Sequence, residues 1–360
     1  MGARPVIPRI VRACLPSRSA GLIGALALLA AGTSAPARAG SRELMAACWP
    51  AGAPSALIAE TRPVRGNTGS FSSPPDRALA PFAPLPAAWR GAVRRVELPK
   101  GRKLIALTLD LCEQPGEVAG YDGPIFDYLR AEGVKATVFV GGKWMASHPA
   151  RTHQLMTDPQ FELANHGWSH RNVRALAGAA LVDEITGPQR SYEAARATLA
   201  GAACVAPRPG LMASVPPRLR LYRFPYGACN PAALDAVAAH GLIAVQWDVS
   251  TGDPSLSQSA AAIAGQMLRN VRPGSIIIAH ANGRGHHTAA ALPMAIPQLK
   301  AQGYEFVAVS ELLAAGRPVL AETCYDSRPG DTDRYDFLFT AGRANLARGS
   351  RDWTTRTVPY

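Results

Sequence analysis

Two histidines four residues apart are the residues of this chain best suited to chemistry. His166 and His170 lie in the segment NHGWSH, directly after an apolar run of strand length. On one face of a helix or turn, imidazoles at this spacing can share a divalent metal such as zinc. Taken alone, such a pair is more often structural, and the lack of glutamate in second position argues against the HExxH proteases.

Four further segments place polar residues at the ends of probable strands. They are TLD at 108–110, RFPY at 223–226, WDVSTGD at 247–253 and IIIAH at 276–280. Asp110 and His280 each follow an apolar run, and such a pair can act as general base and general acid. The alternatives are an aspartate that caps a loop and a histidine that packs in the core. Together the five segments predict a hydrolase site.

Apolar runs alternate with helical stretches from Lys103 onward. We expect strands at Leu104–Leu109, Ala136–Val140, Phe161–Ala164, Leu221–Arg223, Ala244–Trp247, Ser275–Ala279 and Phe306–Val309. We expect helices at Pro124–Ala131, Ala150–Met156, Leu181–Ala200, Pro231–His240, Ser257–Val271, Ala289–Gln302 and Glu311–Ala315. This alternation predicts an α/β fold whose parallel strands form a barrel or a heavily wound sheet. The active site of such a barrel lies at the C-terminal strand ends, where the five segments would meet.

Local signals set some helix limits. Asn230 before Pro231 predicts a helix start, and Gly241 predicts the end of the same helix. Ser310 before Glu311 predicts another start.

The amino terminus has the features of a secretory signal peptide. Four arginines between residues 4 and 18 precede an apolar stretch, Ala20–Ala31, and Ala37-Arg38-Ala39 is a cleavage motif. We expect cleavage after Ala39 and a periplasmic or extracellular protein without a transmembrane anchor; an uncleaved anchor is the alternative. Cleavage would lower the formal charge from +12 to +7. Because the remaining charge is scattered, it indicates an anionic surrounding such as cell wall rather than nucleic acid.

Composition divides the rest of the chain. Residues 40–99 are rich in Pro, Ala and Ser and predict an extended arm or linker, 100–317 form the catalytic domain, and 318–360 form a polar tail. The tail has three residues that could dock it: Cys324, Tyr335 and Phe337. After cleavage five cysteines remain, an odd number, so at least one stays outside the disulfides. Cys112 and Cys229 lie beside two of the segments, and the fold could bring them close to each other.

The five segments, in this order, resemble the polysaccharide deacetylases of carbohydrate esterase family 4, the NodB-homology domain. The resemblance covers roughly residues 100–315. It implies a distorted (β/α) barrel of about seven parallel strands. It also implies removal of acetyl groups from N-acetylated glycans with the help of a divalent metal.

The resemblance assigns roles to individual residues. Asp110 aligns with the base, Arg223 with the arginine that orients it, and His280 with the acid, which Asp253 would hold in its charged form. Tyr226 would supply a backbone N–H to the oxyanion, and His166 and His170 would bind the metal. The candidates for contact with the acetyl group and sugar are Ile276, Ile278 and Trp247.

The chain departs from the family at Leu111, where a metal-binding aspartate is usual. Three possibilities follow: Asp110 binds the metal, Glu113 reaches it, or metal binding is weak or lost. Cys112 is a soft candidate ligand, with a disulfide as an equal alternative. The loop at 282–287 could grip substrate, add a ligand or be solvated.

We therefore expect an exported deacetylase acting on peptidoglycan, chitin oligosaccharide or exopolysaccharide. The alternatives are a non-catalytic carbohydrate-binding relative and an amidase with a smaller substrate, which would need a deep, closed pocket.

Overall fold

The computed structural model describes residues 2, 35–49, 60–66, 71 and 73–336. The expected signal peptide, residues 1–39, lies almost entirely outside these ranges, as does Phe337. Within them, no helix combines the length and the apolar character that crossing a membrane would require.

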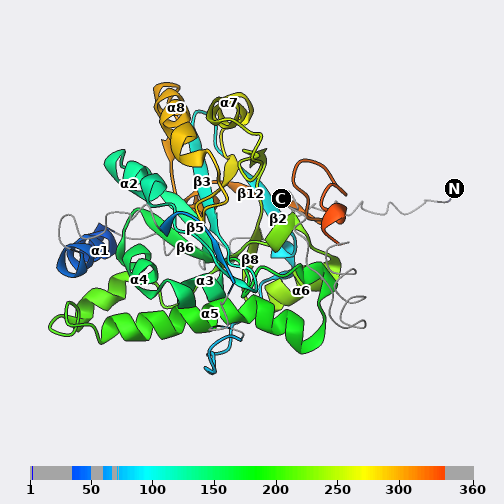
Figure 1. Cartoon of the computed structure of the whole chain (residues 1–360). Coiled ribbons are helices and arrows are strands. Elements are labelled where there is room, and N and C mark those ends of the chain that lie inside the picture. Colours follow the sequence, from blue (N-terminus) through cyan, green and yellow to red (C-terminus); the bar gives the residue numbers. More distant parts are fainter. Residues whose placement is uncertain (1, 3–34, 50–59, 67–70, 72, 337–360) are drawn as a thin grey trace.

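A curled, mostly parallel sheet forms the centre of the molecule (Figure 1). Its strand order is β12-β2-β8-β7-β6-β5-β3-β10-β9, with β11 also paired to β3. The strands are β2 (Ala92–Glu97), β3 (Leu104–Leu111), β5 (Ala136–Val140), β6 (Phe161–Asn165), β7 (Leu221–Tyr222), β8 (Ile243–Val245), β9 (Val249–Ser250), β10 (Ile276–His280), β11 (Glu305–Phe306) and β12 (Arg317–Ala321). A bridge between Arg95 and Ser275 joins the β2 side of the sheet to the segment before β10. The α/β class and the distorted barrel are thereby confirmed.

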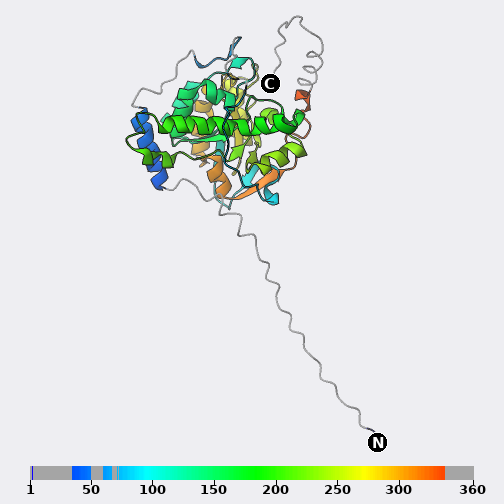
Figure 2. The same ribbon diagram turned by 90° about the horizontal axis from the view of Figure 1, so that it is seen from below.

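Helices cover the outside of this sheet. They are α1 (Ala35–Cys48), α2 (Gly123–Ala131), α3 (Gly142–Ser147), α4 (Pro149–Thr157), α5 (Gly178–Ala200), α6 (Pro231–Ala239), α7 (Ala260–Asn270), α8 (Thr288–Ala301) and α9 (Val309–Ala314). Figure 2 shows α5, the long green helix, running across the folded part of the molecule, where it packs against α3, α4 and α6. Helices α7 and α8 pack against each other at the top of Figure 1, whereas α5 lies at the bottom.

Strand β3 shows how the pleat divides the core. Its side chains alternate between the two faces of the sheet. Ile105, Leu107, Leu109 and Leu111 enter the cluster beneath the helices. Ala106 joins the cluster inside the curl, and Asp110 faces the same interior. The leucines therefore anchor the helix layer while the intervening residues are available to the site.

Five strands and two α-helices of the described residues were not expected from the sequence: three are the two-residue strands β1 (Val64–Arg65), β4 (Glu117–Val118) and β9, and the other two are β2 and β12. Strand β2 lies within the segment predicted as an arm, and β12, within the predicted tail, pairs with it antiparallel. Helices α1 and α3 were also missed. The arm is not simply extended, because α1 buries Leu44 completely in the outer cluster.

Two of the three helix limits read from sequence are confirmed. The Asn230 side chain accepts a hydrogen bond from the N–H of Ala233 (2.8 Å), and Gly241 follows α6 with φ +67°. Ser310 was a wrong prediction. Helix α9 begins two residues earlier, at Val309, and the Glu311 carboxylate accepts from the N–H of Ala308 (3.0 Å) instead.

Two disulfides fasten the outer segments to the domain. Cys48 of α1 pairs with Cys204, and Cys229 pairs with Cys324. Cys112 takes part in neither, so Cys112 and Cys229 do not form a disulfide with each other.

Candidate active site

The C-terminal ends of the parallel strands surround one cavity. Parallel pairing of β10 with β3 sets His280 beside Asp110, so both side chains leave the sheet on the same face. The cavity is lined by Asp110, His166, His170, Tyr226, Trp247, Asp253, Ile278 and His280, among others. Residues from all five sequence segments therefore meet in one place.

Asp110 is held by a fully buried arginine. The Arg223 Nη1 donates to Asp110 Oδ1 (2.8 Å) and to the hydroxyl of Thr108 (2.7 Å), and the Arg223 Cζ lies 3.9 Å from the Phe139 ring centre. Burial alone would raise the pKa of Asp110. The charge of Arg223, with smaller contributions from two histidines, outweighs burial and lowers that pKa. The carboxylate is thus ionised and fixed in direction.

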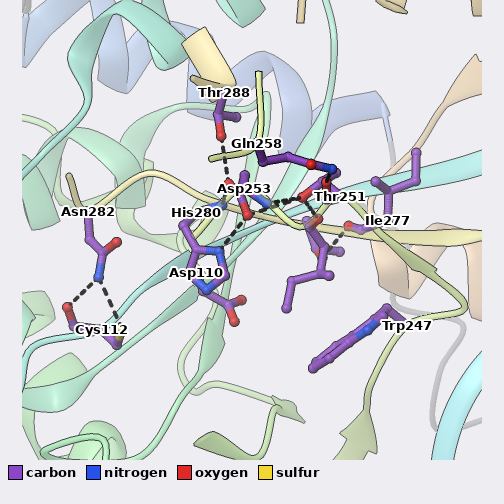
Figure 3. A network of polar contacts seen from close by, with 12 residues as sticks. Asp110, Cys112, Trp247, Thr251, Asp253, Gln258, Ile277, His280, Asn282 and Thr288 are labelled. Carbon is purple, nitrogen blue, oxygen red and sulfur yellow. Dashed lines mark hydrogen bonds and ion pairs between the residues drawn. The ribbon is translucent and has the colours of Figure 1, made fainter. Parts of the chain in front are cut away.

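His280 is paired with a second carboxylate. Its Nδ1 donates to Asp253 Oδ1 (2.9 Å), while Asp253 Oδ2 accepts from the His280 backbone N–H (2.7 Å) and the Thr288 hydroxyl (2.6 Å) (Figure 3). Burial alone would lower the pKa of His280. The Asp253 charge and hydrogen bond reverse the shift and raise it above its ordinary value. His280 is also one of the residues that line the cavity, so its charged imidazole belongs to the site.

The two metal-ligand candidates stand on a loop, not a helix. His166 directly follows β6, and His170 has a left-handed φ of 56°. Glu184 of α5 holds this loop from behind, because its carboxylate accepts from Ser169 N–H (2.9 Å), the Ser169 hydroxyl (3.1 Å) and Arg171 N–H (3.0 Å). Sequence reasoning missed Glu184, which reads as an ordinary helix residue.

The geometry of His166 fits a bound cation. Its Nδ1 donates to the carbonyl of Arg223 (3.0 Å), which leaves Nε2 facing Asp110 Oδ2 at 3.3 Å. Burial lowers the pKa of His166 and, more strongly, that of His170. Neutral imidazoles are the state that binds metal. A lone pair facing a carboxylate oxygen is unfavourable unless a cation lies between them.

Three buried ligand atoms gather at this point. One atom each from Cys112, His166 and His170 lies within 4.8 Å of the other two. Asp110 lies beside this group, with its Oδ2 3.3 Å from His166 Nε2. Residues of the right kind and number for a catalytic zinc site are therefore present.

Glu113 lies outside this group. Its carboxylate accepts from Lys143 Nζ (2.5 Å), the Ser147 hydroxyl (2.6 Å) and the Ala119 N–H (3.0 Å). One residue beyond Cys112, its side chain is directed to α3 rather than to the histidines. These three contacts account for the buried charge, so the expectation that Glu113 reaches the metal is corrected.

The candidates for substrate contact divide in two. Ile278, Trp247 and Tyr226 line the cavity, whereas Ile276 lies one pleat deeper, in the interior core. The structure therefore does not bring Ile276 to the cavity. Tyr226 has φ +60°, which is rare outside glycine and marks a constrained backbone, and its ring packs 4.5 Å from that of His170.

The carboxy-terminal segment forms one wall of the cavity. Asp326, Arg334 and Tyr335 are among the lining residues, and the ring centre of Tyr335 lies 5.1 Å from that of Tyr226. Asp326 also accepts from the indole N–H of Trp247 (3.0 Å). The disulfide to Cys324 explains why a polar tail returns to the site, a link that sequence alone could not assign.

The loop after β10 is built into the site. Asn282 is fully buried and donates to the carbonyl (2.8 Å) and the sulfur (3.1 Å) of Cys112. Arg284 pairs with Glu117 at 2.6 Å. A side chain at Gly285 would overlap the carbonyl of His280, which explains the glycine. In this part of the loop the solvated alternative is excluded.

Comparisons with known proteins agree with this geometry. Residues 97–245 match the family model for polysaccharide deacetylase. The peptidoglycan-N-acetylglucosamine deacetylase PgdA of Listeria monocytogenes is 27% identical over 61% of this chain and 41% of its own length. A chitooligosaccharide deacetylase of Azorhizobium caulinodans is 28% identical over 51% of this chain and 87% of its own.

A solved structure shows the same fold. The Bc1960 peptidoglycan N-acetylglucosamine deacetylase is 25% identical, with a TM-score of 0.51 over 63% of this chain and 96% of its own. The matched part of this chain spans less than half of the Listeria enzyme. With the family model, the relatives and the fold in agreement, the chain carries a polysaccharide deacetylase domain of carbohydrate esterase family 4, the NodB-homology type.

Proposed function

We propose that this protein is an exported hydrolase that removes acetyl groups from N-acetylated glycans. The proposal rests on two ion pairs at one cavity. Asp110 is paired with Arg223, and His280 is paired with Asp253. One pair keeps a carboxylate ionised and the other keeps an imidazole charged. Amide hydrolysis needs both groups: a base for the attacking water and an acid for the departing amine.

Asp110 is the proposed base. Its Oδ1 is engaged by Arg223, and its Oδ2 is directed at the metal-ligand group, where a water would lie. The guanidinium keeps this oxygen unprotonated at neutral pH, so it can accept the proton of a water that attacks the acetyl carbonyl. The buried arginine also prevents the carboxylate from turning away.

His280 is the proposed acid. The Nδ1–H is committed to Asp253, so the proton that can be transferred is on Nε2. It would pass to the sugar nitrogen as the carbon–nitrogen bond breaks, which releases a neutral amine and acetate. The backbone N–H of Tyr226 is the proposed donor to the oxyanion, in the constrained turn that its φ of 60° describes.

A divalent metal, zinc in the first instance, would be held by His166 and His170 with a third ligand. When bound, such an ion polarises the carbonyl and lowers the pKa of its water. The fit of the imidazoles, which are buried and neutral, supports this assignment.

Peptidoglycan is the proposed first substrate, with chitin oligosaccharide and exopolysaccharide next. The names of the relatives in Listeria and Azorhizobium support an N-acetylglucosamine substrate. The basic composition, with a formal charge of +7 once residues 1–39 are removed, suits a protein that works among anionic cell-wall polymers outside the cytoplasm.

A second candidate is an amidase on a smaller substrate. The wall formed by Asp326, Arg334 and Tyr335 favours it, because a long polymer must pass beside this wall to reach Asp110. Acetate release from a disaccharide compared with release from intact peptidoglycan separates the two candidates.

The test is acetate release from chitin oligosaccharides and peptidoglycan, with and without chelator. Asp110→Asn and His280→Gln should each abolish release while the protein stays folded. Glycan binding with no acetate from any substrate would refute the enzyme and leave a carbohydrate-binding protein. If acetate release persists with chelator but is lost in Asp110→Asn, the role of the metal is refuted and the enzyme activity is not.

A further inference from the structure

We infer that the thiolate of Cys112 is the third protein ligand of the metal, in place of the carboxylate that is absent at Leu111. The inference rests on the proposed metal-assisted function and names a residue of the same site. It assigns a mixed sulfur and nitrogen centre, formed by Cys112, His166 and His170, to this chain.

The pleat of β3 explains why the ligand moves by one residue. Leu111 is still within the strand, pairs with Val140 and is fully buried among the leucines under the helices. The next side chain, that of Cys112, therefore returns to the side of Asp110. A ligand at position 111 would face the helix layer, and one at 112 faces the histidines.

The distances support a shared ion. The sulfur and two imidazole nitrogens lie within 4.8 Å of one another, and all three residues are at most 4% exposed. Ligands on one tetrahedral zinc, at about 2.0–2.3 Å from it, lie roughly 3.5 Å apart. The separations between the three atoms thus need to shorten by about 1.3 Å at most. Solvent can reach a fourth position through the cavity, which both histidines line.

Asn282 provides the outer contact that a thiolate ligand needs. Its amide Nδ2 donates to the Cys112 sulfur (3.1 Å) and also to the Cys112 carbonyl (2.8 Å), as Figure 3 shows. The second bond fixes the amide so that its N–H, not its oxygen, faces the sulfur. A donor at this position stabilises negative charge on sulfur and orients it.

Asp110 faces the same group, but it is the proposed base, and the remaining candidate ligands are committed elsewhere. The four cysteines of the described disulfides, Cys48 with Cys204 and Cys229 with Cys324, cannot ligate. Glu113 is bound by Lys143, as described above. Binding releases one proton, because the Cys112 thiol loses its hydrogen to solvent as the sulfur–metal bond forms.

Cobalt(II) absorption tests the inference on the purified protein. A thiolate ligand gives a near-ultraviolet sulfur-to-cobalt charge-transfer band, which nitrogen and oxygen ligands do not. We expect this band at one cobalt per chain, and its loss in Cys112→Ser together with at least a tenfold weaker affinity for cobalt. Cys112→Asp should bind cobalt without the band and shift preference from zinc toward manganese.

Two further variants sharpen the result. Asn282→Ala should keep the band but weaken metal affinity by about 10–100-fold. His287→Ala is the matched control, because this exposed histidine lies near the site but outside the ligand group, and it should leave band and affinity unchanged.

Stoichiometric cobalt without the band in the unsubstituted protein would overturn the inference, as would a band that persists in Cys112→Ser. Neither result depends on the folding of Cys112→Asp. Acetate release is measured separately: deacetylation without a thiolate band refutes the ligand but not the function. A thiolate band in a protein that deacetylates no glycan refutes the function but not the ligand.

Discussion

Replacing Asp253 by Asn should move the alkaline limit of activity to lower pH. His280 must be protonated to act as acid, and it is protonated only below its pKa. In the native site Asp253 raises that pKa against the opposing effect of burial. Asparagine keeps the shape but removes the charge, so Asp253 no longer offsets burial and the pKa of His280 falls.

The structure sets the size of this shift. The two groups are 2.9 Å apart, and the side chains of His280 and Asp253 are 10% and 1% exposed, so solvent screens the pair little. An opposite charge at this distance shifts a pKa by about 1–3 units. The protonated fraction of His280 above the new pKa falls about tenfold per unit. We therefore expect kcat/KM at pH 8 to fall about 10- to 1,000-fold and to recover partly as the pH is lowered.

The assay is acetate release from a chitin oligosaccharide between pH 5 and 10. Thr288→Val is the matched control, because it removes a 2.6 Å hydrogen bond to Asp253 while it keeps the charge. It should move the alkaline limit far less than Asp253→Asn. If Asp253→Asn lowers the rate equally at every pH and leaves the limit in place, His280 is not the acid whose charge Asp253 controls.

Four other substitutions test separate parts of the site. Arg223→Met leaves the buried Asp110 carboxylate unpaired. It should destabilise the fold by about 3–5 kcal/mol in urea unfolding and, by raising the pKa of Asp110, move the acid limit of activity upward; an unmoved acid limit would contradict this. Glu184→Gln removes the charge that holds the histidine loop and should weaken cobalt binding, measured by titration, about tenfold, with unchanged affinity as the contrary result. Tyr335→Ala opens the wall and should raise kcat/KM for peptidoglycan relative to a disaccharide, and an unchanged ratio would show that the wall does not select substrates. Leu111→Asp should not improve cobalt affinity but should lower the melting temperature, because the new carboxylate enters the apolar layer; a gain in affinity would refute the register argument.

Sequence predicted the elements whose patterns are local. Leu104–Leu111 and Ala136–Val140 are mostly apolar because both faces of a parallel strand are buried, and they were placed correctly within two residues. Strand β2 was missed because Arg94 and Arg95 interrupt its apolar pattern. The structure accounts for Arg94, whose guanidinium lies over the Tyr325 ring at 3.9 Å, a partner more than two hundred residues away.

The residues of the candidate site also divide into those with a local sequence pattern and those without one. The strand-end residues Asp110 and His280 could be brought together from the sequence, because parallel strands end at one edge. Glu184, Asn282 and Tyr335 could not. Each acts through a contact made by tertiary packing. The sequence named Tyr335 as a possible docking residue and 282–287 as a possible contact loop but gave the partner of neither, and it did not single out Glu184.

The leucine at 111 and the position of Cys112 both follow from the alternation of side chains along β3, which extends to Leu111. A leucine at 111 stabilises the last residue of β3 by burying its side chain in the outer cluster, a contribution of about 1.5–3 kcal/mol. An aspartate there would have to leave this apolar layer to bind an ion. Once the strand extends to 111, the pleat makes 112 the first position that can again face the histidines, and a cysteine occupies it. The sulfur is less hydrated than a carboxylate and tolerates full burial more easily. A leucine that ends the strand at 111 and a sulfur ligand at 112 are therefore compatible, and the leucine by itself would not give a complete metal site.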